Sequence, residues 1–174
     1  AIGLALAPVV RAAPCPPANI AAPLALVIVP TRELAKQVDE ELSWLFVPAG
    51  VRVASVTGGA SYRDERRALS AGPAIVVGTP GRLLDHLQRG SIDPSRVGAV
   101  ALDEADRMLD LGFRDDIESI LALLPDARRT HLVSATFPRE VRALADAIQT
   151  DAVFAEGTPL GTANEDIEHL LHLV

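Results

Sequence analysis

Apolar runs of strand length alternate with segments of helical periodicity along most of this chain. Residues 24–29 (LALVIV) form a continuous apolar run, which is typical of a strand covered on both faces. The next segment carries one apolar stripe, made of Leu34, Val38, Leu42 and Leu45. That spacing is typical of a helix that packs on a sheet. The alternation predicts an α/β fold, a parallel sheet with crossover helices on both faces.

The same alternation continues beyond these two elements. Further strands are predicted at residues 51–56, 74–77, 97–102, 131–133 and 152–155. Helices are predicted from about residue 61, over residues 80–89 and 113–124, and from Pro138 onward.

Two stretches do not fit the alternation. The proline-rich residues 8–23 predict an irregular loop after an N-terminal helix, and residues 157–164 have linker composition. Residues 167–174 then resume as a strand with no helix behind it. We therefore predict one domain over residues 1–156, and over residues 157–174 a linker with the first strand of a second domain.

Composition narrows the classes of function. No run approaches the roughly 18 uncharged residues of a membrane span, and the first residues lack a basic leader, so we expect a cytoplasmic protein. The net charge of -7 argues against coating nucleic acid by bulk electrostatics, so any such contact should be local. Fifteen arginines against one lysine fit a GC-rich bacterial source. The sparse aromatic residues are expected in the core rather than as base-stacking platforms, namely Trp44, Phe46, Phe113 and Phe137.

The strongest chemical feature is the acidic segment Asp103-Glu104-Ala105-Asp106, which follows an apolar run directly. In an open parallel sheet, ligands bind outside the carboxyl ends of the strands. An acidic residue there can hold Mg²⁺, and a neighbouring carboxylate can orient the water that attacks a phosphate. A polar turn between a strand and a helix would have the same composition, so this segment alone leaves both interpretations open.

Five short segments, each just past a predicted strand, add to this feature. In chain order they are residues 30–35 (PTRELA), 58–59 (GG), 79–82 (TPGR), 103–106 (DEAD) and 134–136 (SAT). Together with the continuation DRMLDLGF they resemble the DEAD-box RNA helicases over essentially the whole chain. The resemblance implies a RecA-like domain of three layers, α/β/α, in an enzyme that uses ATP and Mg²⁺ to separate RNA duplexes locally.

The resemblance assigns sequence-independent RNA contact to three of these segments. Their residues are Pro30, Thr31, Arg32, Gly58, Gly59, Thr79, Pro80, Gly81 and Arg82. Thr79 followed by Pro80 predicts a helix N-terminus, where free amides favour a phosphate, and Arg82 would add a forked donor. The glycine pair also fits a simple tight turn.

The resemblance also assigns roles around the acidic segment. Asp103 would hold Mg²⁺ through water, Glu104 would position the hydrolytic water, and Asp106 would orient the site. Ser134 and Thr136 match the segment that couples nucleotide state to RNA strand separation, and their hydroxyls can bond the acidic segment. A strand end with two small polar residues is the plainer interpretation.

Two features of a complete family member do not occur in these 174 residues: the glutamine-containing adenine-reading motif and a glycine-rich loop ending in Gly-Lys-Thr. Residues 1–10 resemble the helix after that loop, and Lys36 has no glycine loop before it. We expect the full-length protein, with a second RecA-like domain that supplies arginine fingers, to be the helicase. Residues 1–174 alone are expected to be inactive. The alternatives are a non-catalytic RNA-binding or partner-docking module and a DNA helicase of the same superfamily.

Overall fold

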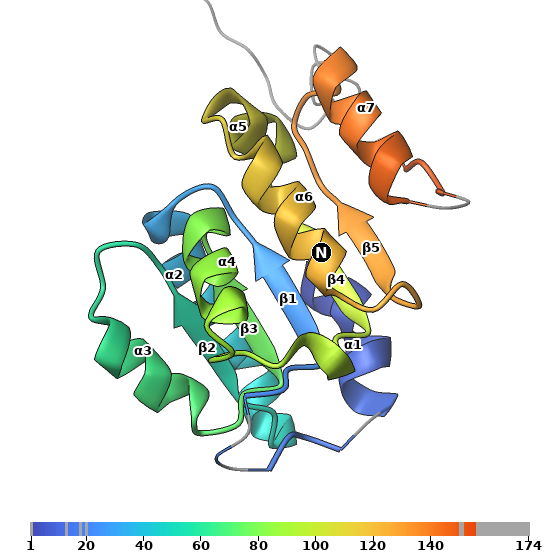
Figure 1. Cartoon of the computed structure of the whole chain (residues 1–174). Coiled ribbons are helices and arrows are strands. Elements are labelled where there is room, and N and C mark those ends of the chain that lie inside the picture. Colours follow the sequence, from blue (N-terminus) through green and yellow to red (C-terminus); the bar gives the residue numbers. More distant parts are fainter. Residues whose placement is uncertain (1, 13, 18, 20, 150–151, 156–174) are drawn as a thin grey trace, which may run out of the picture.

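The computed structural model describes residues 2–12, 14–17, 19, 21–149 and 152–155, and its centre is a parallel sheet (Figure 1). The strands lie in the order β2-β3-β1-β4-β5. Their bounds are Ala25–Ile28 for β1, Val53–Val56 for β2, Ile75–Gly78 for β3, Ala99–Leu102 for β4 and Arg129–Leu132 for β5. Every pairing is parallel, so the predicted α/β class is confirmed.

Helices cover both faces of this sheet. Their bounds are Ile2–Ala12 for α1, Arg32–Phe46 for α2, Tyr62–Leu69 for α3, Pro80–Gln88 for α4, Ala105–Asp110 for α5, Arg114–Leu123 for α6 and Arg139–Ile148 for α7. Two short 3-10 helices, η1 (Val47–Ala49) and η2 (Pro94–Arg96), complete the elements. In Figure 1, α4 and α6 stand in front of the sheet, and α1 and α2 lie behind it.

Strand β1 shows how one sheet serves two cores. Leu26 and Ile28 point into the core shared with α4 and α6, whereas Ala25 and Val27 point into the core shared with α1 and α2. All four residues are fully buried. This burial on both faces is the physical reason for the uninterrupted apolar run in the sequence.

The carboxyl ends of all five strands lie in one row. The register pairs Val56 with Gly78, Gly78 with Ile28, Ile28 with Leu102, and Leu102 with Leu132. The row therefore brings the segments that follow the strands to the same edge of the sheet.

Helix α2 forms where the sequence predicts it, but its buried face differs from the predicted stripe. Ala35 and Phe46 are buried with Val38 and Leu42, whereas Leu45 is 39% exposed. Helical spacing places Phe46 four residues after Leu42, on the same face. The expectation of a core position is also wrong for Trp44, whose exposed fraction is 80%.

Pro8 and residues 152–155 do not have the structure that the sequence predicts for them. Pro8 lies inside α1 rather than in the following loop. Burial of Leu6 and Val10 against the sheet offsets the hydrogen bond that a proline removes from a helix. Residues 152–155 form no strand, because no neighbouring strand pairs with them in the described part of the chain, and Val153 is 94% exposed.

Helix α5 has no counterpart among the predicted helices. It is only six residues long, and its N-cap is Glu104, whose backbone is left-handed, with φ 51° and ψ 52°. A segment this short gives no clear helical period. The predicted linker and final strand, residues 157–174, lie outside the described residues.

Candidate functional site

The segments singled out in the sequence meet along the carboxyl edge of the sheet. Along this edge the order is GG after β2, TPGR after β3, PTRELA after β1, DEAD after β4 and SAT after β5. Backbone hydrogen bonds continue past the strand ends, from Asp103 N to Ile28 O and from Val133 N to Leu102 O. The edge thus has an acidic half, over β4 and β5, and a half with glycine and arginine, over β1, β2 and β3.

Asp103 begins the acidic half and is partly buried. Its Oδ1 accepts a hydrogen bond from the backbone N–H of Glu104 at 3.0 Å. Burial raises the pKa of Asp103 above its ordinary value, and the charge of Glu104 adds to the increase, against the effect of that hydrogen bond. A nearby cation such as Mg²⁺ would therefore favour the ionised form of Asp103.

Asp103 fits a Mg²⁺ ion whose other ligands are mostly waters and substrate phosphates. Within the described residues, no three His, Cys, Asp or Glu side chains converge on a space for a metal ion. Mg²⁺ commonly keeps several waters and binds through one or two carboxylates and substrate phosphates. Asp103 suits that kind of contact.

Glu104 projects from the turn between β4 and α5 and is 39% exposed. Its Oε2 accepts a hydrogen bond from Nη1 of Arg107 at 3.3 Å. An ion pair this exposed contributes little to stability. The carboxylate is therefore free to exchange Arg107 for a water or another donor.

Asp106 connects the acidic segment to the segment after β5, as the sequence suggested. Its Oδ2 accepts hydrogen bonds from Thr136 Oγ1 at 2.6 Å and from Thr136 N at 3.1 Å. Its own backbone N–H donates to Ser134 Oγ at 3.1 Å. Burial by itself raises the pKa of Asp106, but the hydrogen bonds from Thr136, Ser134 and the backbone outweigh it, so the pKa is lowered.

This arrangement gives a direct test at Thr136. Thr136→Val removes the hydroxyl donor but keeps the shape of the side chain and the backbone N–H. The pKa of Asp106 should then rise, because fewer donors stabilise its charged form. A carboxyl ¹³C titration by NMR measures the change, and an unchanged Asp106 pKa would contradict the contact. Thr130→Val, on β5, is the matched control.

The other half of the edge is built around the glycine turn. Ala60 N donates to Thr57 O, which closes the turn, and Gly59 has φ +80°. A Cβ at Gly59 would collide with the guanidinium of Arg32, whose Nη1 donates to Gly58 O at 3.2 Å. The glycine pair therefore lies in a tight turn, next to the other segments predicted to contact RNA. Open space remains beside Gly58.

The neighbouring helix starts supply backbone amides. Thr31 caps α2 by accepting a hydrogen bond from Leu34 N at 3.2 Å. Thr79 is the N-cap of α4, with Pro80 and Gly81 as the first helical residues, but its side chain makes no capping hydrogen bond. The predicted helix start is confirmed, and the Thr79 hydroxyl is not used by its own helix.

Arg82 is paired with Glu65, a residue that the sequence did not single out. Nε of Arg82 donates to Glu65 Oε2 at 2.6 Å, and its Nη2 donates to Ala60 O at 2.9 Å. The guanidinium of Arg82 therefore already donates hydrogen bonds to groups within the protein. Contacts between residues 17 and 22 positions apart leave no mark in sequence periodicity.

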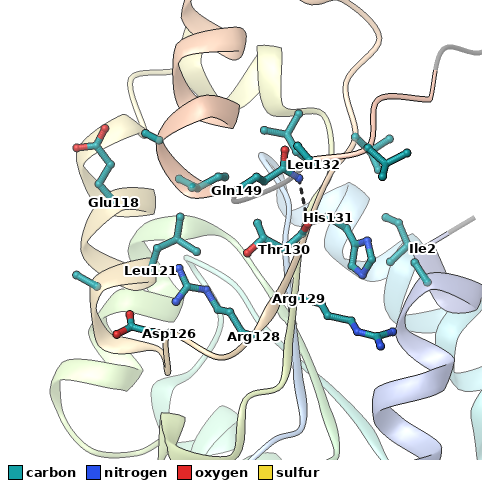
Figure 2. Close-up of a pocket in the computed structure, with 17 residues that line it drawn as sticks. Ile2, Glu118, Leu121, Asp126, Arg128, Arg129, Thr130, His131, Leu132 and Gln149 are labelled. Atoms are coloured by element: carbon teal, nitrogen blue, oxygen red, sulfur yellow. Dashed lines mark hydrogen bonds between the residues drawn. The ribbon is translucent and has the colours of Figure 1, made fainter.

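A separate groove lies beside β5 and contains none of the predicted site residues (Figure 2). It is lined by β5 and by Ile2 of α1, Leu121 of α6 and Ile148 of α7. Gln149 Nε2 donates to Thr130 O at 3.0 Å across it. In the described part of the chain, β5 is paired on one side only, with β4.

A parallel sheet whose carboxyl edge carries the PTRELA, GG, TPGR, DEAD and SAT segments has the architecture of a RecA-like helicase domain. Residues 4–144 match the family model of the DEAD/DEAH box helicases. The chain belongs to this family.

Individual relatives agree with this assignment. The chain is 50% identical over 125 residues to the ATP-dependent RNA helicase DeaD of Escherichia coli, covering 71% of this chain and 20% of the relative. It is 48% identical over 122 residues to the DEAD-box ATP-dependent RNA helicase CshA of Geobacillus kaustophilus, covering 70% of this chain and 26% of the relative.

Solved structures show the same fold. A DEAD box protein from the hyperthermophile Methanococcus jannaschii superimposes with a TM-score of 0.71 at 42% identity, over 75% of this chain and 36% of that one. The yeast DEAD-box splicing factor Prp28 gives a TM-score of 0.75 at 32% identity, over 80% of this chain and 34% of that one. The chain thus corresponds to about a third of these larger proteins.

None of the helices in the described residues has both the length and the apolar character that a membrane crossing needs.

Proposed function

We propose that the full-length protein is an ATP-dependent RNA helicase, an RNA-stimulated ATPase that separates short RNA duplexes. The observation that carries this proposal is the arrangement along one sheet edge. The acidic half and the half with glycine and arginine lie side by side, joined through the strand order β3-β1-β4. Such an edge can bind a nucleotide at one end and an RNA backbone at the other.

The acidic half is assigned the chemistry of ATP hydrolysis. Asp103 would hold Mg²⁺, which would neutralise charge on the ATP phosphates, and Glu104 would position the water that attacks the terminal phosphate. Asp106 orients the turn and, through Ser134 and Thr136, connects it to the segment that follows β5. This contact supports a role for the two hydroxyl residues in coupling hydrolysis to strand separation.

The remaining parts of the ATP site are assigned to segments beyond residues 1–174. We propose that a glycine-rich loop with a lysine binds the ATP phosphates, and that the strand leading to it pairs with β5. The groove beside β5 supports this, because it offers a strand edge between helices of both layers. A second RecA-like domain would close on the same sheet edge and contribute arginines. A bacterial source is supported by the DeaD relative of Escherichia coli and the CshA relative of Geobacillus kaustophilus, and we propose a cytoplasmic location.

The decisive experiment measures ATP hydrolysis by the full-length protein with RNA, with DNA of the same sequence, and without nucleic acid. Stimulation by RNA but not DNA supports the proposal. Stimulation by DNA but not by RNA indicates a DNA helicase. Equal stimulation by both indicates backbone contacts that do not read a 2′-hydroxyl. Binding of RNA without hydrolysis indicates the non-catalytic module.

Arg32 offers a test of RNA contact in the full-length protein. Its side chain is exposed, so Arg32→Ala should weaken binding about equally for all RNA sequences. The slope of log affinity against log salt should fall by about one phosphate contact. Fluorescence anisotropy at several salt concentrations measures both quantities.

Arg11→Ala is the matched control for this test. It removes the same charge from the last turn of α1, which leads toward the amino ends of the strands, away from the proposed RNA contacts. A loss at Arg32 that depends on RNA sequence would point to base recognition and contradict the proposed backbone contact.

A further inference from the structure

Glu65 is a carboxylate buried beneath the glycine turn. Its side chain is only 5% exposed, and the other buried polar residue of the described chain, His86, is in contact with it. Burying a carboxylate is unfavourable unless it is paired and hydrogen-bonded. The groups that contact Glu65 therefore indicate why a carboxylate is buried at this position.

Those partners come from two different segments. Glu65 Oε1 accepts a hydrogen bond from the backbone N–H of Thr57, the first residue of the glycine turn, at 2.7 Å. Its Oε2 accepts Nε of Arg82 at 2.6 Å and lies 2.8 Å from Nε2 of His86, both on α4. Because Glu65 itself belongs to α3, one side chain joins α3, the glycine turn and α4.

Arg82 makes a second connection between the same segments. Its Nη2 donates to the carbonyl oxygen of Ala60, at the end of the glycine turn. Its side chain is 19% exposed, so most of the guanidinium is covered. Arg82 thus differs from Arg32, whose side chain is exposed.

Aromatic contacts fix the orientation of His86. The ring of Tyr62 stacks on the imidazole with centroids 4.5 Å apart and planes 4° apart. The Tyr62 hydroxyl lies 3.0 Å from Ser91 Oγ, and the Arg82 guanidinium carbon lies 5.0 Å from the Tyr62 ring centroid. These contacts hold the partners of Glu65 in one arrangement.

We propose that Glu65 is a positioning residue for RNA binding, which fixes the glycine turn relative to the start of α4. In this arrangement Arg82 acts on RNA through Glu65 and Ala60, by holding the turn, rather than as a phosphate ligand. The inference rests on the proposed helicase function, because it concerns the surface assigned to RNA.

The test uses Glu65→Ala in the full-length protein. The change leaves the Thr57 amide, Arg82 and His86 without their shared acceptor. The RNA concentration for half-maximal ATPase stimulation should rise about tenfold, and the rate at saturating RNA should stay within about twofold. Glu65→Gln keeps the shape and one acceptor oxygen, so it should restore most of the RNA affinity.

Arg82 variants separate positioning from direct phosphate binding. Arg82→Ala should weaken RNA binding with little change in salt slope, unlike Arg32→Ala. Because Glu65 and Arg82 act as a unit, the double variant Glu65→Ala/Arg82→Ala should have about the same RNA affinity as the single variant that binds RNA less tightly.

Three results would overturn the inference. They are unchanged RNA affinity in Glu65→Ala, a salt slope lowered by about one in Arg82→Ala, and parallel loss of rate and affinity in Glu65→Ala without rescue by glutamine. A wild-type protein that RNA does not stimulate would instead refute the proposed function.

Discussion

Glu104→Gln in the full-length protein should lower the rate of ATP hydrolysis by about 10²-fold or more, with ATP and RNA binding largely intact. Glutamine keeps the shape of the side chain but removes the carboxylate that positions and activates water, a contribution of about 10²- to 10⁴-fold in enzymes. Single-turnover hydrolysis, measured with nucleotide binding, separates the chemical step from affinity.

Glu40→Gln is the matched control for Glu104→Gln. Glu40 is an exposed glutamate paired with a nearby cation, Lys36, as Glu104 is paired with Arg107. It lies on α2, outside the predicted site, so its substitution should leave hydrolysis unchanged. Near-normal turnover in Glu104→Gln would remove Glu104 from the role assigned to it.

A polypeptide of residues 1–174 should show no binding of Mg-ATP by calorimetry at sub-millimolar concentrations, and no RNA-stimulated release of phosphate. In P-loop ATPases, affinity depends on the amides of a glycine-rich loop and on a lysine that reaches the β and γ phosphates. These residues contain no such loop, and Lys36 lies in α2 with its side chain 79% exposed. Asp103 and Glu104 would repel the phosphates and attract them only weakly through Mg²⁺.

A longer polypeptide that includes the upstream gene segment is the comparison for this experiment. It should bind Mg-ATP but hydrolyse it slowly, because the arginines of the second domain would still be absent. Tight ATP binding by residues 1–174 would contradict the assignment of the phosphate-binding loop to another segment.

The sequence predicts the edge of the sheet well, because strand burial and parallel pairing are simple constraints. The five predicted strands that form the sheet each end next to a chemically distinctive segment, and parallel strands place their carboxyl ends together. Asp106, Ser134 and Thr136 are up to 30 positions apart, yet their contact follows from the adjacency of β4 and β5.

Other features depend on packing that a single sequence does not reveal. Glu65 looks like an ordinary polar residue of a charged helix, and only the approach of Thr57 and α4 makes it a buried acceptor. Trp44 shows the opposite case, an aromatic residue that helical phase places in solvent. Residues 152–155 have a strand-like composition but no described strand beside them, and β structure requires a neighbour.

The left-handed backbone of Glu104 implies a trade-off between stability and activity. A non-glycine residue held in this region costs about 1–3 kcal/mol, which glycine would avoid. Glycine, however, would remove the carboxylate from the end of β4. This domain therefore carries a strained turn at the place where the proposed reaction needs an acid side chain, and substitutions that relax the turn would make the fold more durable at the expense of catalysis.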